Sequence, residues 1–373
     1  MTMMQLASNR QAMAAEERDG GRRAVSVWLW IVAALVFAMV VVGGATRLTE
    51  SGLSITEWQP LLGAIPPLNE ADWMSAFDKY KQIPQYHALN QGMTLDEFKF
   101  IYYWEWSHRL LGRAIGVVFA LPFLYFWWTR KLKRGTGMKF LGILALGGLQ
   151  GFIGWYMVSS GLSERIEVSQ YRLALHLTTA FMILGLLVWA ALEEWPGVPR
   201  VTGEVATPVI RRMAALIVTA VLVQVVLGAF VAGLRAGYIY NTWPSMNGQF
   251  VPSDYWLKPA YLSFFESHAA TQFNHRMMAY FVAFLSFLQI WLTSRSPVDD
   301  RIRLTAQWLG AAVVMQIALG IFTLLSHVRL DLGLMHQGGG AVVFVLAVVH
   351  LHATRRAGIV PRDFCASRGR ASA

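Results

Sequence analysis

The stretch "EWSHRLLGR", residues 105–113, places a histidine and an arginine side by side where a long apolar run begins. Residues 272–280, "QFNHRMMAY", repeat this arrangement at the start of another apolar run. Ionisable side chains are costly inside a bilayer, so those found there are commonly functional. The two stretches therefore indicate a duplicated membrane protein in which each copy uses a histidine.

The composition is that of a membrane protein. Of the 373 residues, 55% are hydrophobic and only 14% are charged, whereas a soluble domain carries roughly a quarter charged residues. The net charge of +10 is spread over short loops between apolar runs, which is typical of orientation in a bilayer and not of nucleic-acid binding. The single cysteine, Cys365, excludes an internal disulfide and a cysteine-based metal site.

Eight segments are apolar over the length, about 20 residues, that a helix needs to cross a bilayer. They are approximately residues 25–46, 106–128, 140–160, 172–192, 213–234, 272–292, 305–326 and 333–354.

An even number of spans places both termini on one side of the membrane. The stretches on that side hold 20 lysines and arginines, and the opposite loops hold nine. Because cationic loops resist translocation, both termini are expected to face the cytoplasm. The two large outer loops, residues 47–105 and 235–271, contain the sequences "TLDE" (94–97) and "SFFE" (263–266), each of which predicts a helix-starting capping box.

The second half of the chain repeats the first. "LALHLTTAF" (173–181) corresponds to "GLMHQGGGAV" (333–342), and "SGLSITEWQP" (51–60) corresponds to "AGYIYNTWP" (236–244). Both copies have four spans and begin on the same side, which predicts a parallel repeat about an axis along the membrane normal. The predicted fold class is therefore an all-α integral membrane protein in which eight transmembrane helices form two tandem, pseudo-two-fold-related four-helix bundles.

This repeat gives predicted boundaries. An N-terminal tail (1–24) precedes the first four-helix half (25–192), and a cytoplasmic linker (193–212) leads to the second half (213–354) and a C-terminal tail (355–373). Three spans also share the pattern Gln-x-x-x-Gly, at Gln150 with Gly154, Gln224 with Gly228 and Gln316 with Gly320. We interpret these pairs as serving helix packing rather than catalysis. The glycine permits close approach of the helices, and the amide can form hydrogen bonds within the bundle.

Four histidines lie near the outer start of the even-numbered spans: His108, His176, His275 and His336. Two imidazoles that face each other across a four-helix bundle can hold an iron porphyrin. The pairs would be His108 with His176 and His275 with His336, and Arg109 or Arg276 beside them suits a haem propionate. Two other interpretations are simple packing and a zinc or copper site, although the latter lacks acidic or thiol ligands at suitable spacing.

The two copies differ around these histidines. Glu57 stands in the first outer loop where Thr242 stands in the second. The fourth span reads "HLTTA", whereas the eighth reads "HQGGG", in which small residues would let a flat ring lie against the helix. A carboxylate at a pocket mouth can move protons or stabilise a cation, but Glu57 is equally compatible with an ordinary solvated loop residue.

Together with "GGATRLTESGLSITEWQP" (43–60), these motifs resemble the haem A synthases of the COX15-CtaA family over nearly the full chain. The family oxidises a ring methyl group of haem O to a formyl group by successive hydroxylations, and the haem A product enters cytochrome oxidase. The resemblance implies that His275 and His336 bind haem b as cofactor, that His108 and His176 bind the substrate haem iron, and that Glu57 is a functional carboxylate. It also implies haem O synthase, cytochrome oxidase assembly factors and a redox partner as associates.

The chain lacks the outer-loop cysteine pair of some members, so it resembles the mitochondrial and proteobacterial type. Acidic residues in the first 24 positions argue against a transit peptide and favour a bacterial inner membrane. Two other functions remain open on the residues alone: a bis-histidine di-haem electron carrier and a haem transporter.

Overall fold

The structure is a computed structural model that describes residues 3–59, 62–133, 135–163, 165–196 and 206–356, with the backbone alone at 3–18 and 356. Eight of its helices are long and apolar enough to cross a membrane, which confirms the predicted number. They are α1 (Met3–Leu48), α4 (Leu95–Trp128), α5 (Thr136–Ser159), α6 (Gln170–Glu194), α7 (Pro208–Gly233), α9 (His268–Arg295), α10 (Asp300–Leu325) and α11 (Leu330–Arg356). The described residues contain no β-strand, so the all-α prediction is also confirmed.

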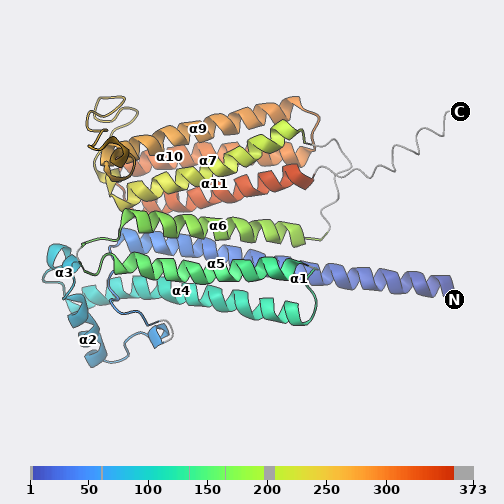
Figure 1. Ribbon diagram of the computed structural model, residues 1–373, viewed down its shortest axis with the longest axis horizontal. Helices are drawn as coiled ribbons and strands as arrows, with labels where there is room; N and C mark the ends of the chain where they lie inside the picture. Colours follow the sequence, from blue (N-terminus) through green and yellow to red (C-terminus); the bar gives the residue numbers. More distant parts are fainter. Residues whose placement is uncertain (1–2, 60–61, 134, 164, 197–205, 357–373) are drawn as a thin grey trace.

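The helices group in the order of the sequence. Helices α1, α4, α5 and α6 contact one another, and α7, α9, α10 and α11 contact one another. The two groups lie side by side, and the start of α1 and the end of α11 lie at the same end of the molecule (Figure 1). We call that end the terminal end and the opposite end the loop end. This grouping is consistent with two tandem four-helix bundles.

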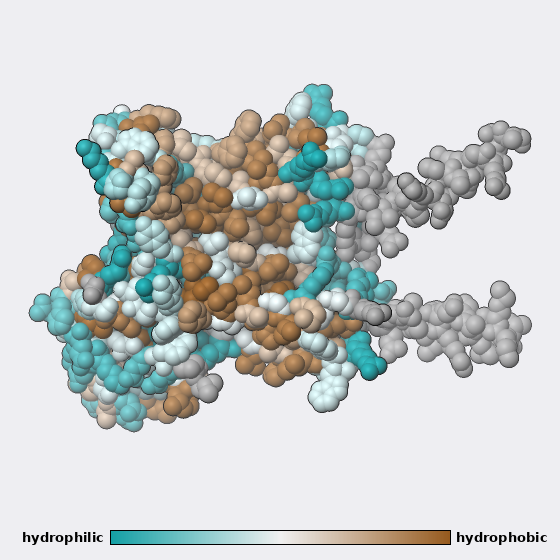
Figure 2. All heavy atoms as spheres, viewed as in Figure 1, coloured by the Kyte–Doolittle hydropathy of each residue, from teal (hydrophilic) through white to brown (hydrophobic). Residues whose placement is uncertain are grey.

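The two groups meet along α6, α7, α1 and α11. Phe181 of α6 packs edge-on against Phe344 of α11, with ring centres 5.5 Å apart. Gly185 leaves room for this contact, because a Cβ there would lie 3.0 Å from the Phe344 ring. A single buried apolar cluster runs through both groups, and side chains in the middle of the molecule form an apolar band between two polar ends (Figure 2).

Helix α4 begins well before the predicted membrane segment. Its N-cap is Thr94, whose side chain accepts a hydrogen bond from the backbone N–H of Glu97 while Glu97 accepts from the N–H of Thr94. The capping box predicted at 94–97 is therefore confirmed. The second predicted box was wrong: Ser263 begins a four-residue helix, α8 (Ser263–Glu266), and α9 is instead capped by Ser267, which accepts from Ala270 N–H.

The loop end carries a small aromatic-rich layer. Helices α2 (Glu70–Tyr80) and α3 (Pro84–Leu89) lie there beside the start of α4 (Figure 1). Trp73, Phe77 and Tyr80 of α2 are buried against Phe98 of α4. This layer fixes the loop that follows α1, which approaches the first histidine pair.

A cluster of charges joins the two groups at the loop end. Glu167 accepts from Arg47 at 2.6 Å and from Arg235 at 3.0 Å, and Arg235 also pairs with Glu50. Arg47 and Arg235 are corresponding positions of the repeat, so one carboxylate holds both copies together. The middle of the predicted linker, residues 197–205, and most of the predicted C-terminal tail, residues 357–373, lie outside the described residues.

Candidate haem-binding sites

Each of the four histidines faces a glycine on the neighbouring span. A Cβ placed on Gly43 of α1 would lie 3.1 Å from the His108 ring, and one on Gly154 of α5 would lie 2.9 Å from the His176 ring. The same contact is 3.0 Å from Gly228 to His275 and 2.8 Å from Gly320 to His336. Contacts below 3.0 Å, as at Gly154 and Gly320, would force a shift, and those at Gly43 and Gly228 are tighter than most real Cβ contacts, so these glycines provide the space that the imidazoles occupy.

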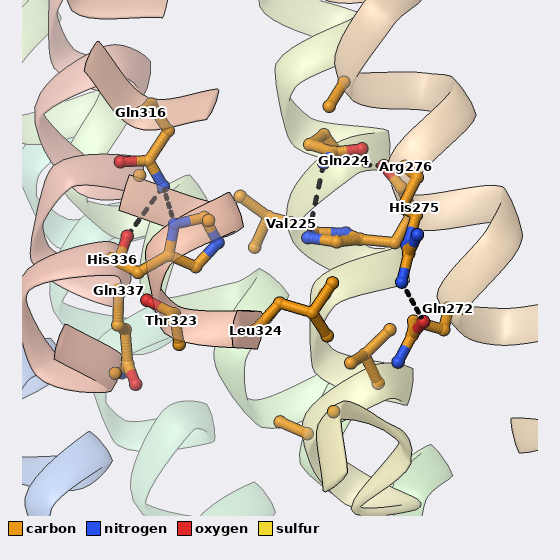
Figure 3. Close-up of a pocket in the computed structure, with 18 of the residues that line it drawn as sticks. Gln224, Val225, Gln272, His275, Arg276, Gln316, Thr323, Leu324, His336 and Gln337 are labelled. Atoms are coloured by element: carbon orange, nitrogen blue, oxygen red, sulfur yellow. Dashed lines mark hydrogen bonds between the residues drawn. The ribbon is translucent and has the colours of Figure 1, made fainter. Parts of the chain in front are cut away.

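Three of the histidines also contact a glutamine one turn before their glycine. Gln150 Nε2 donates to the backbone carbonyl of His176 at 2.9 Å and lies 3.1 Å from Nδ1 of its ring. Gln316 contacts the His336 carbonyl at 2.7 Å and Nδ1 at 3.1 Å, as Figure 3 shows. Gln224 contacts the His275 carbonyl at 3.0 Å and the ring at 3.4 Å. The sequence-level interpretation of these residues as packing alone was therefore incomplete, because each one also touches a ring nitrogen.

The pair in the second half faces a cavity. The ring centres of His275 and His336 are 6.3 Å apart at an angle of 83°. Two metal–nitrogen bonds of about 2 Å each would place two coordinated imidazole centres roughly 6 Å apart. Both rings line a cavity of about 340 Å³, within the range of about 300–1,000 Å³ that is usual for small-molecule sites.

Buried polar atoms in this cavity lack partners among the described residues. They are Oε1 of Gln224 and of Gln316, Nδ1 of His275 and Nε of Arg276. Leaving such an atom unpaired is costly. An imidazole that binds a metal through one nitrogen donates its other ring N–H to a nearby acceptor. The amide oxygens of Gln224 and Gln316 would supply that acceptor after a rotation of the amide, because Nε2 faces the ring in this structure. The donor set, spacing and unpaired acceptors fit a bis-histidine haem.

The first pair, His108 and His176, comes from two spans of the first group of helices. His108 comes from α4 and His176 from α6, the helices predicted to supply them. Of the three glycines after His336, only Gly340 lines the cavity of the second pair. Gly338 faces Phe37 and Val41 of α1, and Gly339 faces Gln316, so two of these three glycines serve helix packing and not a flat ring.

The two arginines beside the histidines fasten loops. Arg109 donates to the carbonyls of Ile55 and Glu57 at 2.8 and 3.0 Å, and Arg276 donates to those of Tyr240 and Thr242 at 2.9 and 3.0 Å. The four acceptors are matching positions of the two outer loops. Arg276 nevertheless lines the cavity with its Nε unpaired, whereas Nε and both terminal nitrogens of Arg109 have partners.

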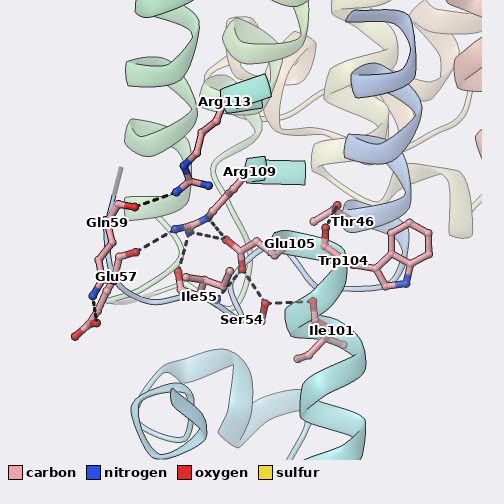
Figure 4. A network of polar contacts seen from close by, with 10 residues as sticks. All are labelled: Thr46, Ser54, Ile55, Glu57, Gln59, Ile101, Trp104, Glu105, Arg109 and Arg113. Carbon is pink, nitrogen blue, oxygen red and sulfur yellow. Dashed lines mark hydrogen bonds and ion pairs between the residues drawn. The ribbon is translucent and has the colours of Figure 1, made fainter. Parts of the chain in front are cut away.

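A buried carboxylate, Glu105, lies on the same helix as His108, and it was not among the residues predicted from the sequence. Its side chain is 3% exposed and accepts from Arg109 at 2.6 Å, Ser54 Oγ at 2.8 Å and Ile55 N–H at 2.7 Å (Figure 4). It stands three residues before His108, so both lie on one face of α4. The internal repeat could have identified Glu105 from the sequence, because the matching residue in the second half is an amide, Gln272, and not a carboxylate.

Glu57 lies differently from what its motif suggested. Its carboxylate is 47% exposed, pairs with Lys79 at 2.7 Å and accepts from Gln59 at 2.9 Å. Figure 4 shows this side chain pointing away from Arg109 and Glu105. Only the backbone carbonyl of Glu57 reaches the network beside His108.

A further histidine, fully buried, lies at the terminal end. His350 of α11 is within 2.7 Å of Gln289 Nε2 and 2.9 Å of Thr305 Oγ1 through its two ring nitrogens. Both ring nitrogens are hydrogen-bonded by neighbouring helices, which is the pattern of a structural core histidine.

The fold and the paired histidines define an eight-span α-helical membrane protein with two similar, non-identical histidine pairs. A profile described as "Cytochrome oxidase assembly protein" (COX15-CtaA) matches residues 26–348. The chain is 49% identical to a Heme A synthase of Parvibaculum lavamentivorans over 342 residues, which are 91% of this chain and 96% of that protein. It is 48% identical to a Heme A synthase of Mesorhizobium japonicum over 351 residues (94% and 96%) and 50% identical to one of Chelativorans over 334 residues (89% and 91%). The chain belongs to the COX15-CtaA family.

Proposed function

We propose that this protein is a haem A synthase that oxidises a ring methyl group of haem O to a formyl group by successive hydroxylations. The relatives that carry this name cover nearly the whole chain. In this proposal haem b is the cofactor between His275 and His336, and the substrate haem O is bound between His108 and His176. The observation that carries the division of labour is the difference between Glu105 and Gln272 at one position of the repeat.

Haem b would be held by the imidazoles of His275 and His336, which Gln224 and Gln316 contact, with Arg276 Nε available to a propionate. When bound, it would supply redox chemistry that side chains lack. The cavity has apolar walls, which include Phe181, Val221 and Val313 and would contact the porphyrin ring.

In the first half, this chain's residues would position the substrate and its charge. Glu105 is fixed by Arg109, Ser54 and Ile55, so it provides a preorganised negative charge one turn from His108. Such a charge stabilises a cation that develops on the reacting group, and a carboxylate can also accept the proton released there. We therefore place the functional carboxylate of the proposal at Glu105, in preference to Glu57, whose side chain faces Lys79.

The proposal extends to the cellular setting. The excess of basic residues on the side of both termini and the bacterial relatives support a bacterial inner membrane with cytoplasmic termini. Haem O synthase would supply the substrate, cytochrome oxidase assembly factors would receive the product, and a redox partner would exchange electrons with the enzyme.

The test is direct. The protein is produced together with a source of haem O, and the haems extracted from the membrane are identified by mass. Appearance of haem A, absent without the protein, is the expected result. Bound haem b in both pockets with no haem A would instead establish the di-haem carrier.

A further inference from the structure

The fourfold pattern of glycine and glutamine has one exception. The residue four positions before Gly43 on α1 is Met39, where α5, α7 and α10 carry Gln150, Gln224 and Gln316. The end of the Met39 side chain lies against the helix turn after its histidine, as the end of the Gln316 side chain does. Its Cε lies 3.2 Å from the Cβ position of Gly112, one turn after His108, and Gln316 Nε2 lies 3.5 Å from that of Gly340, one turn after His336.

The position of Met39 is fixed by the other half of the molecule. Gln337 of α11 donates to the backbone carbonyl of Val40, the next residue of α1, at 2.6 Å. Gly44 of the same turn lies against the Gln337 side chain. Helix α1 therefore cannot slide to bring a different residue opposite His108 without breaking this contact between the halves.

The exception changes what holds His108. Among the described residues, no hydrogen bond reaches the His108 ring, whereas the other three imidazoles each have a glutamine at 3.1–3.4 Å. A thioether donates no hydrogen bond and accepts only weakly. Outer partners of a metal-bound imidazole fix its orientation, and their loss typically changes metal affinity or activity about 10–100-fold.

We propose that Met39 makes His108 the exchangeable axial ligand of the substrate haem, while Gln150 holds His176 as the fixed one. This inference rests on the proposed function, in which His108 and His176 bind haem O. A substrate haem must enter and leave, unlike a cofactor, and an unsupported imidazole can rotate away from the iron. The coordination position that it leaves is on the side of Glu105, three residues before His108 on α4. Met39 is thus a positioning residue that acts through His108.

The experiment compares Met39→Gln with Met39→Leu in purified full-length protein that carries haem b and is loaded with ferric haem O. Cyanide is the probe, because it binds ferric iron only where a ligand gives way. Wild type and Met39→Leu should bind cyanide with similar Kd, since leucine resembles methionine in size and lacks a hydrogen-bonding group. Met39→Gln should raise the Kd about tenfold or more and slow the transfer of haem O to excess apomyoglobin by a similar factor.

Gln150→Met gives an independent arm, because it removes the support of His176. It should lower the cyanide Kd about tenfold. Retention of haem b is the criterion for a folded protein, and Gln150→Met replaces Met39→Gln as the test if Met39→Gln fails that criterion. A cyanide Kd that is unchanged in folded Met39→Gln, or in Gln150→Met in its place, overturns the inference. So does haem O that binds the wild type without histidine ligation.

Formation of haem A is measured on the same preparations, and it tests the proposed enzyme activity separately from the role of Met39. A wild type that forms no haem A overturns the proposed enzyme, whereas the cyanide comparison still decides whether His108 is the weaker ligand. A wild type that forms haem A, with equal cyanide affinity in all variants, retains the enzyme and overturns the role of Met39.

Discussion

Glu105 and Gln272 occupy one position of the internal repeat, and each accepts a hydrogen bond from the arginine one turn later. Arg109 donates to Glu105 Oε1 at 2.6 Å, and Arg276 donates to Gln272 Oε1 at 2.7 Å. Both side chains are buried, at 3% exposure each. The geometry is thus conserved between the halves while the charge is not, which places a fixed carboxylate beside only one of the two histidine pairs.

Replacing Glu105 by Gln should abolish most haem A formation and leave haem b in place. The amide retains the size of the side chain but removes the charge, and loss of an acid–base group commonly costs about 10²–10⁴-fold in rate. Haem extraction measures the product, and the absorption spectrum measures the cofactor. Gln272→Glu is the matched control in the other half, and it should affect haem b content more than turnover. A Glu105→Gln protein with normal turnover would contradict the assignment.

Glu57→Gln should have a much smaller effect than Glu105→Gln. The Glu57 carboxylate is half-exposed in an ion pair with Lys79, and such surface pairs contribute about 0–1 kcal/mol. We expect haem A formation within roughly twofold of wild type, measured under identical expression. A loss of activity as large as that of Glu105→Gln would restore the prediction made from the loop motif.

The four histidines should separate into two classes. His275→Ala or His336→Ala removes an axial bond from the proposed cofactor and should lower the haem b content of the purified protein severalfold. His108→Ala or His176→Ala should retain haem b and lose haem A formation. The measurement is the reduced-minus-oxidised spectrum of each variant beside its haem A yield. Equal loss of haem from all four variants would support two permanent haems and an electron carrier.

Much of the fold was predictable because its signals are local. Eight apolar runs gave the eight spans, and "TLDE" gave the start of α4 at Thr94. Recognition of the four histidines and of the repeat needed only spacing. Glu57 and Glu105 could not be ranked from sequence, because the ranking depends on the path of a loop. Arg109 binds the Glu57 backbone carbonyl, so the loop approaches the site while its side chain turns away.

The role of the arginines was also beyond local patterns. Arg109 and Arg276 were expected to bind propionates, but most of their donors hold the carbonyls of the preceding loops. A sequence shows that an arginine is present but does not indicate which acceptors its guanidinium binds in the folded protein. The "SFFE" capping box failed for a similar reason, since Ser263 Oγ accepts from Leu257 N–H and α9 begins after Ser267.

The layer of α2 and α3 should loosen at alkaline pH through Tyr80. Burial raises the pKa of Tyr80 to about 12 from its ordinary value of 10.0. The unfolded state therefore loses this proton at lower pH than the folded state, so the stabilisation is complete below pH 10 and is lost as pH rises toward 12, by roughly 2–3 kcal/mol. Tryptophan fluorescence from Trp73, which packs in the same cluster, follows the change. Tyr80→Phe should remove part of this alkaline transition, and an identical transition in that variant would exclude Tyr80 as its source.

Gly154→Ala should weaken binding of haem O while leaving haem b in place. A Cβ at Gly154 would lie 2.9 Å from Cε1 of His176, so the imidazole must move or rotate, and an error of about 1 Å at a site is enough to cost roughly 10²-fold in function. Gly151 is the matched control on the same helix, because a Cβ there meets nothing within 4 Å. Titration of each purified variant with haem O gives the affinity, and the reduced-minus-oxidised spectrum gives the haem b content. Gly151→Ala should behave as wild type in both measurements. Equal affinities for Gly154→Ala and Gly151→Ala would show that His176 does not bind the substrate haem in the orientation seen here.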